Sequence, residues 1–406
     1  MYMSPKIYAA LFIVNICVSS LSAQISDQDS IKTSMNMDAV YNRPFLTFDK
    51  FPVNLGGYLE ANSIYSIEDG LSEGLSFQAR RLTVFISASI SKRIKFLGEL
   101  EFENGTEEIA IEFASMDIAL HPLLNLRGGI VLNPIGSFNQ NHDGPKWEFV
   151  ERPDVSTNLL PATFSNAGFG IYGKAYKGDW TLGYEAYLTN GFDTSIINNE
   201  EERTFLPAVK ENSERFEDNF SGSPLLNGKL AIKHRKIGEL GISYMGGIYN
   251  REEIDGLQVD TESRRVDVLA FDLNTTINKT GTRLIGEMAY IWVGVPDTFT
   301  QQFGNQQAGF FVDIIQPVLK TKILDWEDAI LNLSHRTDFV DYNIGEFAQT
   351  NTDIGDDLFA LTPALSFRPS PQTVLRINYR YQWQQDILNN PVSRTATWYF
   401  GISTYF

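Results

Sequence analysis

The chain contains 406 residues, of which 50 are acidic and 33 basic, so its formal net charge at pH 7 is -17. This acidity argues against a nucleic-acid partner, because binding phosphates requires clustered Lys and Arg. The mean hydropathy of -0.17 argues against a bundle of membrane helices, each of which needs about 20 apolar residues in a row. A transmembrane β-barrel is not excluded, because its strands alternate lipid-facing and lumen-facing side chains.

Residues 1–23 have the organisation of a secretory signal peptide. Lys6 supplies the positive charge, residues 7–17 form a short apolar run, and Ala23 provides a small residue before the cleavage site. The apolar run is too short to serve as a membrane anchor. We therefore expect an exported protein that begins at about Gln24.

The only cysteine of the chain, Cys17, lies in this predicted signal. A lipoprotein signal is disfavoured because the bulky Ile16 precedes it. A mature chain without thiols has no disulfides, so it needs a large or closed fold. Residues 24–54 are polar without clear periodicity, and we expect them to form a periplasmic lead-in.

Residues 55–406 are predicted to form one all-β domain, a transmembrane antiparallel β-barrel of about sixteen strands. Most of the segments have the 9–13 residues that a tilted strand needs to cross a bilayer, and an even number is usual in bacterial barrels. The predicted strands are 55–65, 75–90, 93–103, 109–120, 124–132, 167–177, 179–190, 224–235, 238–249, 265–277, 281–293, 309–319, 328–340, 357–369, 373–384 and 395–406.

Connections between these segments alternate in length, which favours an outer-membrane barrel. Those after even-numbered strands are short, as at Gly178, and match periplasmic turns. Those after odd-numbered strands are expected to be long extracellular loops. These long connections are 66–74, 133–166, 191–223, 250–264, 294–308, 341–356 and 385–394.

Several strands separate polar from apolar side chains with a period of two, as a barrel wall requires. The pattern is clear in 373–384 and 281–293 and poor in 109–120 and 265–277, where we expect a bulge or a different register. The last segment ends on Phe406. A terminal aromatic residue is usual in bacterial outer-membrane barrels, so the barrel-assembly machinery is an expected partner of this strand.

Four short motifs resemble the porin O/P family, the phosphate-selective porins O and P. They are QARRL at 78–82, GGIVLNPIG at 128–136, WEFVERP at 147–153 and GFFV at 309–312. In layout, the resemblance covers roughly residues 55–406. It implies a sixteen-stranded barrel, a homotrimer, a third loop that folds inward to narrow the pore, and some preference for anions such as phosphate.

The connection after the fifth predicted strand, 133–166, is the third loop at the extracellular end and the longest connection. It is longer than an ordinary loop needs to be, so we expect it to be functional. One interpretation is a constriction loop whose charged side chains touch the permeating solute. The alternative is an extracellular or trimer-contact loop with locally paired charges. The candidate residues are Asp143, Lys146, Glu148, Glu151 and Arg152.

Alternation also predicts a lumen of mixed charge, which favours passive diffusion of small hydrophilic solutes or ions with weak charge preference. A cationic strip that guides anions is the alternative. The predicted pore-lining cations are Arg81, Lys95, Lys229, Lys233, Arg283, Arg336, Arg376 and Arg380, and the predicted acids are Glu99, Glu101 and Glu287.

Evidence for other chemistry is thin, and we expect neither an enzyme, a metal site nor a cofactor. The four histidines lack metal-ligand spacing, and the acidic stretch 353–357 lacks the other ligands of a calcium loop. Two alternatives remain: a barrel for surface recognition or adhesion through its acidic loops, or an outer-membrane hydrolase. For the hydrolase, His335 is the one candidate, and no partner serine or acid can be specified.

Overall fold

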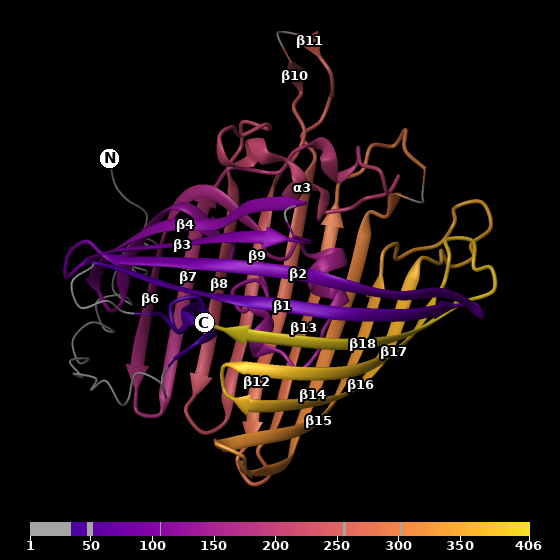
Figure 1. Cartoon of the computed structure of the whole chain (residues 1–406). Helices are drawn as coiled ribbons and strands as arrows, with labels where there is room; N and C mark the ends of the chain where they lie inside the picture. Colours follow the sequence, from indigo (N-terminus) through magenta and orange to yellow (C-terminus); the bar gives the residue numbers. More distant parts are fainter. Residues whose placement is uncertain (1–33, 47–51, 106, 255–256, 301–302) are drawn as a thin grey trace.

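The computed structural model describes residues 34–46, 52–105, 107–254, 257–300 and 303–406. Within these residues, sixteen antiparallel strands close into one barrel, in which β1 pairs with β18 (Figure 1). The predicted fold class is confirmed, and each of the sixteen predicted segments overlaps one barrel strand. The expected signal peptide and residues 24–33 lie outside the described residues.

The barrel strands are β1 Val53–Glu68, β2 Leu71–Ser89, β3 Ile94–Glu103, β4 Glu108–His121, β5 Leu124–Leu132, β6 Ser165–Lys177, β7 Trp180–Thr189, β8 Leu225–His234, β9 Gly238–Ile248, β12 Arg265–Ile277, β13 Thr282–Val293, β14 Gln306–Ile323, β15 Trp326–Asp341, β16 Asp357–Ser370, β17 Thr373–Gln384 and β18 Ser393–Tyr405. The other elements are η1 Asn36–Asp38, η2 Gly144–Lys146, η3 Val155–Leu159, η4 Thr194–Ile196, α3 Ala208–Glu211, η5 Ser213–Phe216, β10 Glu253–Ile254 and β11 Leu257–Gln258. No described helix is both long and apolar enough to cross a membrane.

Short turns gather at one end of the barrel and long loops at the other, which correspond to the periplasmic and extracellular ends of an outer-membrane barrel. The β10–β11 hairpin projects beyond the long-loop end (Figure 1).

The prediction of a long connection at 66–74 is wrong. Strands β1 and β2 continue to a two-residue turn, Asp69-Gly70, whose φ angles of 46° and 88° suit a tight hairpin.

The strand pairing is interrupted by several register shifts, and two of them turn an extra charged side chain inward. In β2, the register shifts between the pairs Glu60–Arg81 and Asn62–Gln78, so two residues of β2 stand opposite one of β1. Arg80 and Arg81 therefore both reach partners inside the barrel. In β4, a shift opposite Leu100 accounts for the poor alternation predicted in 109–120.

The outer face is apolar, as a lipid-facing wall must be. Leu230, Met288, Leu333, Leu375 and Ile402 are among the large apolar side chains exposed on it. The poor alternation of 265–277 has a different cause from a bulge, since the pairing of β12 is regular. Instead, the first half of the inner face of β12, from Val266 to Ala270, is also apolar.

This apolar inner wall belongs to a hydrophobic core inside the barrel. Val266, Val268 and Ala270 of β12 are fully buried and cluster with side chains of β13 and β14 and of the loops at 133–164 and 190–224. The loops thus pack against one side of the lumen as they would in a soluble protein. The remaining inner wall is charged.

Part of the expected periplasmic lead-in lies inside the barrel, which differs from the sequence-based expectation. Met35, Met37 and Val40 are buried, and Met35 and Met37 cluster with Ala231 of β8. The segment leaves the lumen beside β1, where Leu46 forms a β-bridge with Leu55. We call residues 34–46 the lumen segment.

Candidate functional site

The predicted inward-folding third loop is confirmed. Between β5 and β6, residues 133–164 turn into the barrel and pack on one side against its apolar wall. The Glu287 carboxylate accepts hydrogen bonds from the backbone N–H groups of Ser137 and Phe138 at 2.6 and 2.9 Å. Val155 and Leu159 are buried in the hydrophobic core beside Phe311. We call residues 133–164 the inner loop.

The other side of the inner loop is held by arginines of the charged wall. Arg376 donates to the carbonyl oxygens of Trp147 and Phe149 at 3.3 and 2.6 Å, and to the Glu60 carboxylate at 2.7 Å. Arg376 is only 2% exposed. Its guanidinium therefore fixes the loop backbone rather than facing solvent.

Arg368 and Arg336 hold the loop in a similar way. Arg368 Nε donates to Glu148 at 2.8 Å, and Arg336 donates to the carbonyl oxygen of Glu151 at 2.8 Å. Glu148 is fully buried and also accepts a hydrogen bond from the Ser366 hydroxyl. The loop is thus tied to β15, β16 and β17 by charge-assisted hydrogen bonds, which are stronger than neutral ones.

Two further ion pairs beside the inner loop retain some contact with solvent. Arg80 pairs with Glu151 at 2.5 Å, with side chains 19% and 27% exposed. Arg380 pairs with Asp154 at 2.5 Å and lies 3.4 Å from Asp338. These side chains lie between the inner loop and the wall.

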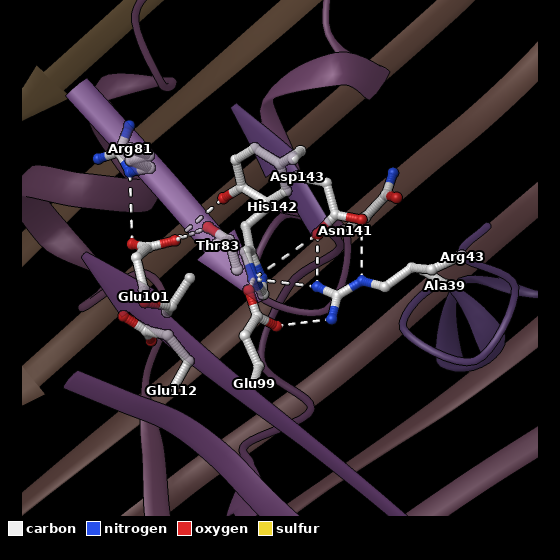
Figure 2. A network of polar contacts seen from close by, with 12 residues as sticks. Ala39, Arg43, Arg81, Thr83, Glu99, Glu101, Glu112, Asn141, His142 and Asp143 are labelled. Atoms are coloured by element: carbon white, nitrogen blue, oxygen red, sulfur yellow. Dashed lines mark hydrogen bonds and ion pairs between the residues drawn. The ribbon is translucent and has the colours of Figure 1, made fainter. Parts of the chain in front are cut away.

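The lumen segment meets the inner loop at Arg43. The guanidinium lies between two carboxylates: Nε donates to Asp143 at 2.9 Å, and Nη1 donates to Glu99 of β3 at 2.6 Å (Figure 2). His142 Nε2 lies 3.3 Å from Nη2, and the ring of Phe85 stacks 4.0 Å from the guanidinium carbon. All three charged side chains are fully buried.

This contact shifts the pKa values of the groups that meet there. Burial alone would raise the pKa of the Asp143 carboxyl, but the neighbouring Arg43 and Lys146 hold it well below its ordinary range. Burial alone would lower the pKa of Arg43, but Asp143 and Glu99 raise it above its ordinary value. The pKa of Lys146 is lowered by burial despite Asp143 at 2.9 Å. Asp143 and Arg43 are therefore both charged at neutral pH.

Two cavities lie at opposite ends of the barrel and differ in charge. One of about 420 Å³, near the short-turn end, is lined by three cations, Lys146, Arg283 and Arg368, and by Asp328. Another of about 600 Å³, at the long-loop end, is rich in acids. Its charged lining residues are Glu68, Glu201, Glu202, Arg203, Asp356 and Asp386.

The predicted pore-lining residues fall into different environments. Arg81, Arg336, Arg376 and Arg380 form ion pairs with inner acids, as do Lys229 with Asp272 and Glu99 with Arg43. Glu101 accepts from Tyr58 and Thr83, Glu287 binds the loop backbone, and Lys233 donates to the carbonyl oxygen of Ser34. Arg283 is half-open at 37% side-chain exposure, and Lys95 is exposed.

The loop candidates also divide. Asp143 and Glu148 are fully buried, whereas Lys146, Glu151 and Arg152 are partly exposed. Sequence reasoning missed Arg43, Arg80 and Asp154. For Arg80, the paired arginines at 80–81 were the available indication, but strict alternation assigns only one of them to the lumen.

Comparison with known proteins agrees with this architecture. No protein-family model matches the chain. An uncharacterized protein of Aquifex aeolicus is 24% identical over 371 residues, which cover 86% of this chain and 80% of that protein. Among solved structures, an anion-selective porin from Comamonas acidovorans has a TM-score of 0.54 at 13% identity, over 87% of this chain and 99% of its own.

Two further porin structures give similar values. Salmonella typhi OmpF has a TM-score of 0.53 at 10% identity, over 89% of this chain and 100% of its own. Pseudomonas putida OprB has a TM-score of 0.53 at 8% identity, over 87% and 94% of the two chains. This chain has the fold of the outer-membrane porins. With its apolar outer wall, this porin-fold barrel lies in the bacterial outer membrane.

Proposed function

We propose that the protein is a porin that lets small hydrophilic solutes or ions diffuse passively across the outer membrane, and that it is not an enzyme. The observation that carries this proposal is the inner loop, which is held at a fixed depth inside a closed barrel by both the apolar and the charged wall. A loop held in this way narrows a lumen to a defined size. Selectivity then depends on the charged side chains that remain exposed beside it.

The charge preference is proposed to be weak, with at most a modest bias towards anions such as phosphate. Most inner arginines are neutralised by acids at ion-pair distance, including Arg336 by Asp313 and Arg376 by Glu60. The cationic cavity at the short-turn end favours anions, whereas the acidic cavity at the other end disfavours them. The electrostatic fields of the two cavities therefore act in opposite directions on an anion that crosses the barrel.

Membership of the porin O/P family remains a proposal. It is supported by the four sequence motifs and by the inward orientation of both arginines of the pair at 80–81. The homotrimer rests on this resemblance and would be tested by native mass measurement in mild detergent. Engagement of the assembly machinery by β18 is supported by the exposed terminal Phe406, which is 49% exposed beside β1.

Planar-bilayer recording of the purified protein tests the proposal. We expect stepwise conductance and, under a KCl gradient, a small reversal potential. Arg283→Ala should move this potential towards cation preference, because Arg283 is a partly exposed cation of the inner wall whose ion pair with Glu148 is long, at 3.7 Å. The matched control is Arg235→Ala, which removes a turn arginine that pairs with Asp179 and is 43% exposed.

The outcomes separate the candidate functions. Absence of conductance from heat-modifiable, folded barrel would contradict the porin proposal and favour surface adhesion. A strongly anion-selective reversal potential that the double variant Arg376→Ala/Arg380→Ala abolishes would contradict the weak preference. The hydrolase candidate His335 contacts the Thr337 hydroxyl through Nε2 at 3.2 Å, but among the described residues no acid lies at hydrogen-bond distance to orient it as a base.

A further inference from the structure

The lumen segment and the inner loop enter the barrel from opposite ends. The lumen segment joins β1 at the short-turn end, whereas the inner loop follows β5 from the long-loop end. They meet where Arg43 binds Asp143 and where Lys146 donates to the carbonyl oxygen of Ala39 at 3.2 Å. The lumen segment and the inner loop therefore support each other by direct contact.

Several contacts hold the lumen segment along the inner wall from β9 to β3. The backbone N–H of Asn36 donates to Glu239 of β9 at 3.0 Å, and its side chain donates to the carbonyl oxygen of Ser137 at 3.0 Å. Asp38 pairs with Lys174 of β6. Val40 clusters with Leu97 and Phe113 on β3 and β4. The segment thus occupies the lumen beside nearly half of the wall.

Arg43 is the charged centre of this arrangement. It fills a cup formed by Glu99 of the wall and by His142 and Asp143 of the inner loop (Figure 2). One carboxylate oxygen or ring nitrogen from each of these three side chains lies within 4.8 Å of the other two. Removing the guanidinium would leave two buried carboxylates side by side with a single adjacent lysine, Lys146. Two buried like charges that share one counter-charge are unfavourable, so we expect the tip of the loop to leave this position.

We propose that residues 34–46 are a latch within the pore, in which Arg43 is the positioning residue that holds the tip of the inner loop and keeps the lumen closed between β3 and β9. The inference rests on the proposed porin function. With the latch in place, the space that remains for solute at the short-turn end is the cavity between the inner loop and the wall that Arg283 and Arg368 line. Release of the latch adds the space beside β3 to β9 to the path.

Single-channel recording of Arg43→Ala tests the latch, with Arg43→Lys as the conservative variant and Arg235→Ala as the control. A chelator in the buffer keeps divalent cations out of the emptied cup. We expect Arg43→Ala to raise conductance about twofold and to add rapid fluctuations, and we expect Arg43→Lys to stay close to the wild type. Unchanged conductance and noise in folded Arg43→Ala would overturn the proposal.

A reversible crosslink distinguishes the latch from general loosening of the fold. A Cβ atom built on Gly183 lies 2.9 Å from the Met37 sulfur, so a Met37→Cys/Gly183→Cys pair can join the lumen segment to β7. In the Arg43→Ala background, oxidation should return the conductance towards the wild-type value, and reduction should raise it again. No difference between the oxidised and reduced forms would contradict the latch.

Maleimide labelling of Met37→Cys tests the latch without relying on conductance. Met37 is 6% exposed, so a cysteine there should be protected in the otherwise wild-type barrel and should react in the Arg43→Ala background. Equal protection in both would overturn the latch even if the protein conducts. Differential labelling in a protein that does not conduct would support the latch and contradict only the porin function.

Discussion

Arg336 of β15 and Asp313 of β14 form a bidentate ion pair on the inner wall, with N–O distances of 2.7 and 2.8 Å. The two side chains are 2% and 0% exposed, and the third contact of the guanidinium is the carbonyl oxygen of Glu151 in the inner loop. The pair therefore joins two strands and fixes the loop. The pair contributes to stability because the guanidinium, the carboxylate and the loop carbonyl all find hydrogen-bond partners in one arrangement.

Removal of one partner should destabilise the barrel much more than removal of both. We expect Arg336→Met to cost about 3–5 kcal/mol, because Asp313 is left as an unpaired buried carboxylate. Arg336→Met/Asp313→Leu should recover most of this loss. Urea unfolding followed by heat-modifiable gel migration measures both, and equal losses in the two variants would contradict this account.

The bulge in β2 should be essential for the orientation of Arg80. Deletion of Ala79 restores regular pairing and turns Arg80 to the lipid side, where an arginine costs about 2–4 kcal/mol near the bilayer midplane. The deletion should lower the yield of folded barrel. Adding Arg80→Leu to the deletion should restore that yield, whereas a failure to do so would show that the bulge itself is required.

The apolar side of the inner loop should control channel noise. Leu159→Ala leaves a cavity in the core, with an expected cost of about 2–5 kcal/mol, and should loosen the loop without removing any charge. We expect more current fluctuation at an unchanged reversal potential. Leu388→Ala, in an outer loop and 67% exposed, is the matched control and should resemble the wild type.

The Arg43–Asp143 contact should resist mild acid. The folded-state pKa of Asp143 is below its ordinary value of about 3.9, so its contribution to stability is complete above that value and is lost only as the pH falls through the lower folded pKa. Conductance should therefore be the same at pH 7, 5 and 4. A reversible increase in conductance between pH 7 and 5 would contradict this account.

The wall of the barrel was predictable from sequence because strand alternation and turn chemistry are local properties. Even the poor alternation of 109–120 indicated the bulge opposite Leu100. The first connection was predicted to be too long, because Asp69-Gly70 is a tight turn within polar strand ends that resemble a loop.

The contents of the lumen were harder to predict. Alternation selected arginines such as Arg376 as inward-facing, but their partners are distant in sequence: Glu60 lies 316 residues away. The location of the lumen segment could not be inferred, since a polar segment without periodicity gives no indication of what it packs against. Alternation shows that a charged side chain faces the lumen. Whether that side chain is an exposed pore charge or a buried structural one depends on a partner that is distant in sequence.

The hydrophobic core inside the barrel also constrains the order of assembly. Val155 and Leu159 lie against Gly309 of β14, which follows Leu159 by 150 residues in the sequence. Until β13 to β15 are in place, the apolar side of the inner loop lacks its packing partners and is exposed to aggregation. We therefore expect the inner loop to reach its final packing late in folding, as the wall closes.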